Sequence, residues 1–275
     1  AYIAGDLGVI TMTLYPEVQT KVPHAIEAYE AALLGYHSAM VMTDHAVTQA
    51  CSALERSVIK HPNYALTKAL LANTYCIEYF CNLTTCDNLL NKAESLAHEA
   101  VELDRECQEA SWSLAQVHFF KNQHDQCLRE LQVTLELNPN NPPILASCGF
   151  ILPMLGQWEL AMEYTERAIR LNPHHPSWYH FTPTLYHLVH GDQQKAATHA
   201  DLLNTSGLFW GPLLRAVIFS MVGRTQDAYQ EIAMLKELQP NFHAHGRRLI
   251  KRLLVPDDTD SLFFSALSQL GLELE

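Results

Sequence analysis

A short sequence motif occurs twice in this chain, as Leu-Glu-Leu-Asn-Pro at residues 135–139 and as Ile-Arg-Leu-Asn-Pro at residues 169–173. A related motif, Ala-Val-Glu-Leu-Asp, lies closer to the N-terminus at residues 100–104. The leucines that these motifs share are spaced by 34 residues: Leu103, Leu137 and Leu171. This period is typical of antiparallel helix pairs that stack on their neighbours, because a single pair cannot bury its apolar face. The spacing therefore predicts an all-α repeat fold.

The residues between the motifs fit helix pairs. Turns are predicted at 122–125, 156–157 and 223–224, and the last two contain glycine, which accepts the positive φ of a helix end. Proline follows the second helix of several pairs, where it stops the helix. Small side chains let paired helices approach closely, and they occur at the expected crossings: Ala115, Cys127, Gly149, Ala161, Ala168, Ala216 and Ala228.

We expect about six helix pairs over residues 24–242, stacked as one right-handed superhelix. Residues 243–275 are expected to form C-terminal capping helices, near 242–254 and 259–271. Residues 1–23 are expected to be a remnant or linker from a preceding domain. The second pair carries about nine extra residues, which predict a longer connection at 79–90 that keeps Cys81 and Cys86 as free thiols.

These repeats resemble the tetratricopeptide family. Two segments, 172–183 and 207–224, also resemble the C-terminal repeat region of bacterial multidomain signalling proteins. Such proteins carry a CadC-type winged-helix domain or a class III adenylate cyclase domain in front, often followed by a TolB-like domain. The opening residues 3–10 resemble the end of that TolB-like domain. The resemblance implies a regulatory region and leaves both kinds of front domain open.

Composition limits the function classes. The chain has 18 basic and 30 acidic residues, a net charge of −12, which argues against sequence-independent nucleic-acid binding by this region. No apolar run is long enough to span a membrane. Seven cysteines are an odd number, and most lie in apolar helical stretches, so we expect reduced thiols and a cytoplasmic location.

Catalytic and cofactor chemistry has no support in the motifs. Nucleophile elbows, zinc-protease motifs and phosphate loops are missing from the sequence. Histidines are dense between His174 and His190, but zinc usually needs three or four ligands and only Asp192 lies nearby. We therefore predict a protein that is not an enzyme, with no catalytic residue, no cofactor and no metal site.

The first helix of each pair lines the concave groove in the tetratricopeptide family, and the family's groove positions are apolar and aromatic here. They lack the Lys, Arg and Asn with which groove-binding members grip a peptide carboxylate. The candidate groove residues are Trp112, Gln116, Phe119, Phe120, Phe150, Met154, Trp178, Phe181, Leu185, Trp210 and Leu213.

The leading hypothesis is a protein-interaction and regulatory sensing module of a bacterial signalling protein. Its groove would take an apolar peptide, a partner domain, or a sister domain of the same polypeptide, or would form a homodimer. The alternative is a structural scaffold or dimerisation arm whose groove is filled by its own trailing helices. A metal-binding or enzymatic protein is the least favoured reading.

Overall fold

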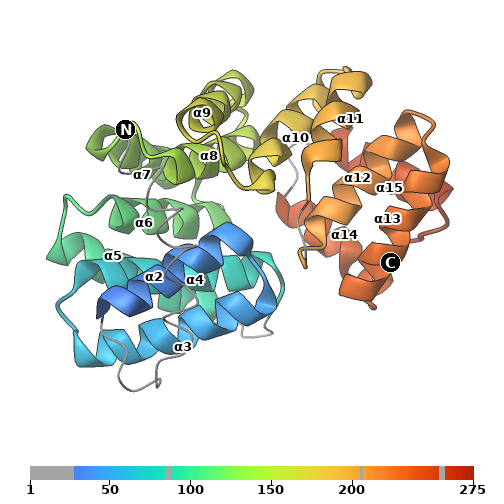
Figure 1. Cartoon of the computed structure of the whole chain (residues 1–275). Coiled ribbons are helices and arrows are strands. Elements are labelled where there is room, and N and C mark those ends of the chain that lie inside the picture. The colour runs from blue at the N-terminus through green and yellow to red at the C-terminus, as the bar shows by residue number, and fades with distance from the viewer. Residues whose placement is uncertain (1–27, 84–87, 205–206, 254–257) are drawn as a thin grey trace. The chain divides into compact units, whose positions relative to one another are not determined.

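The computed structural model describes residues 28–83, 88–204, 207–253 and 258–275. These residues form α-helices joined by short connections and include no strand, so the all-α prediction is confirmed (Figure 1). The predicted remnant at 1–23 and the start of the first pair lie outside the described residues. The chain divides into two compact units, at residues 145 and 146, within helix α8.

Unit 1 contains three helix pairs. First helices lie beside first helices, because α4 contacts both α2 and α6, and each first helix also packs on its own second helix. Alanines with no exposed surface, among them Ala50, Ala72 and Ala97, let these helices approach closely. The pairs are α2 (Ala28–Val41) with α3 (Asp44–Lys60), α4 (Ala65–Phe80) with α5 (Leu89–Leu103), and α6 (Gln108–Phe120) with α7 (His124–Leu137).

Unit 2 contains the remaining pairs and two trailing helices. The first of its pairs is α8 (Pro142–Ile151), extended by the 3-10 turn η2 (Leu152–Leu155), with α9 (Trp158–Leu171). The 3-10 turn η3 (Ser177–His180) then leads into α10 (Phe181–Val189). The helices that follow are α11 (Gln193–Leu202), α12 (Trp210–Met221), α13 (Thr225–Leu238), α14 (Phe242–Leu253) and α15 (Asp258–Gln269).

The repeated motif marks the end of a second helix, as predicted. Leu137 and Leu171 are the last residues of α7 and α9, and the asparagine after each is the C-cap. The predicted turns are also present, with Gly156 and Gly223 at φ values of 73° and 77°. Sequence spacing alone therefore locates these helix ends.

The small residues lie where the helices cross. Cys127, Ala161 and Ala228 have no exposed surface. Gly149 on α8 faces α9, and a Cβ there would lie 2.9 Å from the carbonyl oxygen of Ala161. The closest approach of this pair therefore depends on the absence of a side chain.

The nine-residue insertion is shared between a helix and a connection. Helix α4 has 16 residues against 13 in α6, so part of the insertion extends the helix. The connection runs from Cys81 to α5, and Cys81 is a buried free thiol. Cys86 and the rest of 84–87 lie outside the described residues.

The trailing helices belong to the core of unit 2. Helix α15 packs against α12 and against α14, and Leu249, Ile250 and Leu267 are fully buried. Within the described part of the chain, no helix combines the length and the apolar character needed to cross a membrane.

Candidate functional site

Burial divides the predicted groove residues into two sets. Some are nearly inaccessible and act as core: Trp112, Phe119, Phe181, Leu185, Trp210 and Leu213. Others are partly exposed, so they can meet a partner: Gln116, Phe120, Phe150, Met154 and Trp178. Only the second set offers contact area without prior unfolding.

Unit 1 gathers four aromatic rings, which we name aromatic cluster 1. Phe120 lies at its centre, with its ring centroid 5.4 Å from Tyr79, 6.3 Å from Phe80 and 5.0 Å from Phe119. Tyr79 and Phe80 end α4, and Phe119 and Phe120 end α6. Because Tyr79 and Phe120 are partly exposed, the cluster presents aromatic edges at the ends of two adjacent first helices.

The sequence analysis missed Tyr79 and Phe80. The insertion after α4 breaks the spacing of this unit, so the family's groove positions could not be assigned to it from the sequence. A usable signal existed: two consecutive aromatic residues end each of these first helices, at 79–80 and at 119–120.

Unit 2 pairs two predicted residues from adjacent first helices. The rings of Phe150 on α8 and Phe181 on α10 lie 5.1 Å apart. The hydroxyl of Thr182 donates to the carbonyl oxygen of Gly149 over 3.2 Å, which fixes α10 against α8. We name Phe150 and Phe181 aromatic pair 2. Phe150 is partly exposed and offers apolar surface, and the buried ring of Phe181 packs against it.

Trp210 and Leu213 belong to the packing of the C-terminal helices. The ring of Phe209 lies 4.4 Å from Trp210 and 5.9 Å from Phe242 of α14. Helix α15 also contacts α12. Trp210 and Leu213, which the sequence assigned to a groove, are therefore buried in a pair whose first helix packs on α15.

A polar contact spans the first helices of unit 1. The hydroxyl of Tyr36 on α2 donates to a carboxylate oxygen of Glu109 on α6 over 2.7 Å. Burial and the neighbouring carboxylate raise the pKa of Tyr36 far above its usual value, so the phenol stays protonated and keeps donating. This contact fixes the two helices that flank α4.

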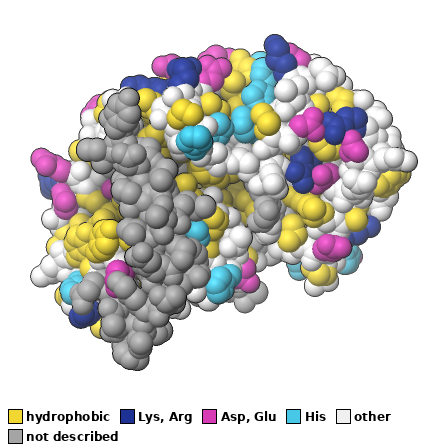
Figure 2. Space-filling model, viewed as in Figure 1, with side chains coloured by type: hydrophobic (Ala, Val, Ile, Leu, Met, Phe, Trp, Pro, Cys, Tyr) yellow, Lys and Arg dark blue, Asp and Glu magenta, His cyan; other side chains and the backbone are white. Residues whose placement is uncertain are grey.

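Histidines form a connected row in unit 2, which we name the histidine chain: His175, His180 and His199. Nε2 of His175 lies 3.1 Å from Nε2 of His180, and Nδ1 of His180 lies 3.1 Å from Nδ1 of His199. His187 stacks on His199 with ring centroids 5.5 Å apart. Figure 2 shows several histidine side chains gathered over the helices around α10.

These imidazoles touch one another and do not converge on a common point. Among the described residues, no group of three or more His, Cys, Asp or Glu side chains is arranged to hold a metal ion. Burial and the two neighbouring imidazoles lower the pKa of His180 to about 4. The arrangement therefore suits proton-dependent hydrogen bonding better than metal coordination.

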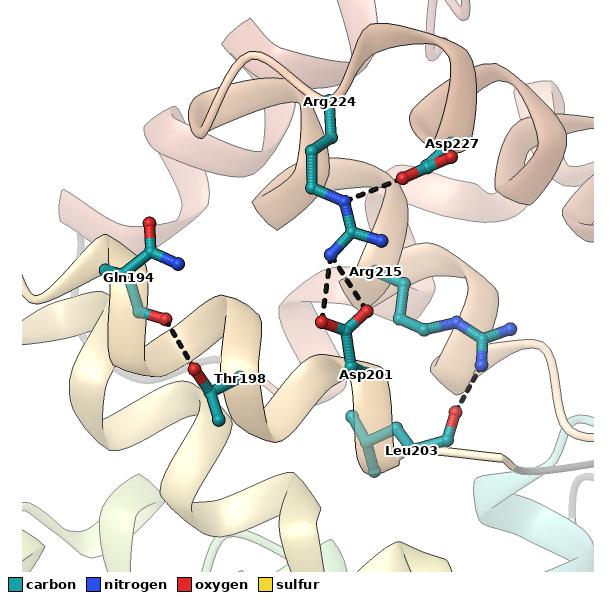
Figure 3. A network of polar contacts seen from close by, with 7 residues as sticks. All are labelled: Gln194, Thr198, Asp201, Leu203, Arg215, Arg224 and Asp227. Atoms are coloured by element: carbon teal, nitrogen blue, oxygen red, sulfur yellow. Dashed lines mark hydrogen bonds and ion pairs between the residues drawn. The ribbon is translucent and has the colours of Figure 1, made fainter.

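Arginines of the 207–224 segment have structural partners (Figure 3). Arg224 donates to Asp227 over 2.6 Å and to Asp201 over 2.8 Å, which joins the start of α13 to α11. Arg215 pairs with Glu231 over 2.7 Å and donates to the carbonyl oxygen of Leu203. The contact of Arg215 with Leu203 ties the end of α11 to α12.

No protein-family model matches this sequence, and no curated protein matches it either. Solved structures do match its fold. PilF of Pseudomonas aeruginosa is 17% identical, with a TM-score of 0.51, over 76% of this chain and 90% of PilF. TTC0263, a tetratricopeptide-repeat protein of Thermus thermophilus, is 16% identical, with a TM-score of 0.53, over 70% of this chain and 98% of its own.

A third match is a monomeric mutant of IFIT1, solved with Gppp-AAAA, at 12% identity and a TM-score of 0.67. It covers 98% of this chain, which spans 64% of the IFIT1 chain. At such low identity these likenesses show the fold alone. This chain has the tetratricopeptide-repeat fold.

Proposed function

We propose that this protein is a protein-interaction module that binds an extended apolar segment of a partner protein on its first helices. The observation that carries the proposal is aromatic cluster 1, where the partly exposed rings of Tyr79 and Phe120 meet edge to face at 5.4 Å. Aromatic side chains supply large contact areas with few rotatable bonds, which is why they dominate binding energies at interfaces.

The wider context is a regulatory, partner-sensing region of a bacterial signalling protein. This part of the proposal rests on the resemblance of residues 172–183 and 207–224 to such regions. Arg215 and Arg224 of the second segment hold structural contacts, which is consistent with a repeat scaffold rather than an anion-binding site.

A second candidate is a scaffold arm that fills its own groove. It is favoured by one observation, the burial of Trp210 and Leu213 in a pair that packs on α14 and α15. That observation concerns the last pair, whereas Phe120 and Phe150 stay partly exposed. The scaffold candidate therefore applies to the last pair. The binding candidate predicts that a partner contacts Phe120 and Phe150.

The test is peptide selection followed by affinity measurement. Peptides selected from a random display library against the protein are measured by fluorescence anisotropy with wild type, Phe120→Ala and Tyr79→Ala. Removing one aromatic anchor is expected to weaken binding roughly tenfold or more. The matched control is Ile59→Ala, which removes a large side chain, 82% exposed, from the second helix α3.

If no peptide binds, or if Phe120→Ala and Tyr79→Ala bind the selected peptides as wild type does, the scaffold candidate replaces the binding proposal. If only the Ile59 variant loses affinity, the binding surface lies on the second helices instead.

A further inference from the structure

The hydrogen-bond directions in the histidine chain can be assigned from one end. Nδ1 of His175 lies 3.1 Å from the backbone carbonyl oxygen of Asn172, which can only accept. Neutral His175 therefore carries its proton on Nδ1 and leaves Nε2 as an acceptor. Nε2 of His180 must then donate to it, and Nδ1 of His180 must accept from His199. All three donors point from His199 towards Asn172.

This chain connects three segments of unit 2. His175 lies in the connection after α9, His180 ends η3, and His199 lies on α11. Trp178 is part of η3, and Phe181 follows His180 directly and contacts Phe150. The imidazole contacts thus hold the segment that leads into aromatic pair 2.

The chain has room for one additional proton only. One proton fits on Nε2 of His199, or on His180 if His199 changes its tautomer, and every nitrogen contact keeps one donor and one acceptor. A second proton places N–H groups face to face at a separation of 3.1 Å and sets like charges side by side. At least one of the two imidazole contacts must then break.

Other ionisable groups surround the chain and modify this response. The carboxylate of Glu166 on α9 favours protonation of His187 and His199, while Lys195 on α11 disfavours protonation of His187. Burial raises the pKa of Tyr179, which stacks on His175, so its phenol stays neutral. The remaining groups that face the row are Asp192 and His190, both acting on His187.

We propose that His175, His180 and His199 form a pH-sensitive latch: a second proton opens it, releases η3, and weakens partner binding at aromatic pair 2. The last step rests on the proposed function, whereas the opening itself does not require a partner. The direction follows from linkage. Histidine in an unfolded chain has a pKa near 6.5, and the folded chain lowers that of His180 to about 4. The contribution of the latch to stability is therefore present above about pH 6.5 and is lost as the pH falls towards 4.

The partner-free test is ¹⁵N NMR of the histidine rings of the wild-type protein, followed from about pH 7.5 to about pH 4.5. We expect Nδ1–H on His175, Nε2–H on His180 and Nδ1–H on His199 at the upper pH. His180 should gain its proton at least one pH unit below the value of about 6.5 of a free histidine, in step with a shift of the Trp178 indole N–H signal. Titration of His180 at about pH 6.5, or an unchanged Trp178 indole signal, would overturn the latch.

Two variants link the latch to binding. His180→Phe replaces the central imidazole by a ring that cannot titrate, and His174→Asn removes an exposed neighbouring histidine as a matched control. A peptide selected against wild type, and weakened by Phe150→Ala, is expected to lose affinity roughly tenfold between about pH 7.5 and about pH 5. His180→Phe should abolish this pH dependence, and His174→Asn should keep it.

The outcomes separate the two proposals. If the wild-type rings titrate as expected but peptide affinity does not change with pH, the latch exists without regulating binding, and the regulatory step is wrong. If no selected peptide depends on Phe150, the proposed function fails at this surface while the NMR result still decides whether the latch exists. If His180→Phe does not fold, the wild-type spectra alone decide.

Discussion

Phe120 at the end of α6 meets Tyr79 at the end of α4 edge to face, with 5.4 Å between ring centroids. The two residues are 41 positions apart and become neighbours because α4 and α6 are first helices of consecutive pairs. Within unit 1, the packing of α4 against α6 thus brings the aromatic ends of two consecutive first helices together. Phe119, next to Phe120 in α6, is only 6% exposed, so one of these two adjacent rings is buried in the core and the other is partly exposed.

Alanine substitution should separate the core ring from the surface ring. Phe119→Ala removes a buried side chain and is expected to lower the free energy of unfolding by about 3 kcal/mol. Phe120→Ala removes a partly exposed ring and its edge contacts, at a cost of about 1 kcal/mol. Urea unfolding followed by circular dichroism measures both. Equal losses of stability would show that Phe120 is a core residue and does not belong to a binding surface.

Gly149→Ala should destabilise unit 2. The new methyl group would collide with the hydroxyl of Thr165 and lie 2.9 Å from the carbonyl oxygen of Ala161, so α8 and α9 must separate. A loss of about 2 kcal/mol is expected from this overpacking. Ser147→Ala on the same helix is the control and should change stability by less than about 0.5 kcal/mol. A neutral Gly149→Ala would mean that these helices are packed more loosely than the structure shows.

Arg215 and Glu231 should depend on each other. Both side chains are 14% exposed, so removing either one leaves a charge that is poorly solvated. Arg215→Met is expected to cost about 3 kcal/mol, and the double variant with Glu231→Met should be more stable than the sum of the single losses predicts. Thermal unfolding of wild type, the two single variants and the double variant completes this double-mutant cycle. Additive losses would indicate that the pair is not coupled.

The cysteines should be protected in the native protein. Burial raises the pKa of Cys107 to about 11 and that of Cys127 to about 12, and Cys76 and Cys81 are buried free thiols. In a Cys86→Ser background, a thiol reagent near neutral pH should react roughly a hundredfold more slowly with native than with denatured protein. All six remaining thiols should react in denaturant without reductant. A missing thiol would reveal a disulfide among them.

Much of the fold could be predicted because the same helix-ending motifs and turn glycines recur from one helix pair to the next. Leu137-Asn138 and Leu171-Asn172 end second helices, and the glycines at 156 and 223 mark turns, since each depends on local backbone geometry. The same regularity failed at the second pair. An insertion there lengthened α4, and a count along the sequence could not show how many residues remained helical.

The site was less predictable because exposure is a property of packing. Phe150 and Trp210 have equivalent aromatic character in the sequence, yet Phe150 is partly exposed and Trp210 is 3% exposed. Trp210 lies on α12, which packs against the trailing helix α15, and the local sequence does not indicate where a trailing helix will pack. The histidine chain is similar, because His199 joins it from α11, 19 residues after His180.

Whether the first helices form the binding surface is tested most directly by an NMR map of where a selected apolar peptide binds. Methyl and aromatic signals of the labelled protein are followed during titration with a peptide whose affinity depends on Phe120. The largest shifts are expected from aromatic cluster 1, at Tyr79, Phe80 and Phe120. Signals of exposed residues on second helices, such as Ile59 and Val133, should keep their positions. Shifts confined to the second helices α3, α5 and α7 would contradict the claim that the first helices form the binding surface.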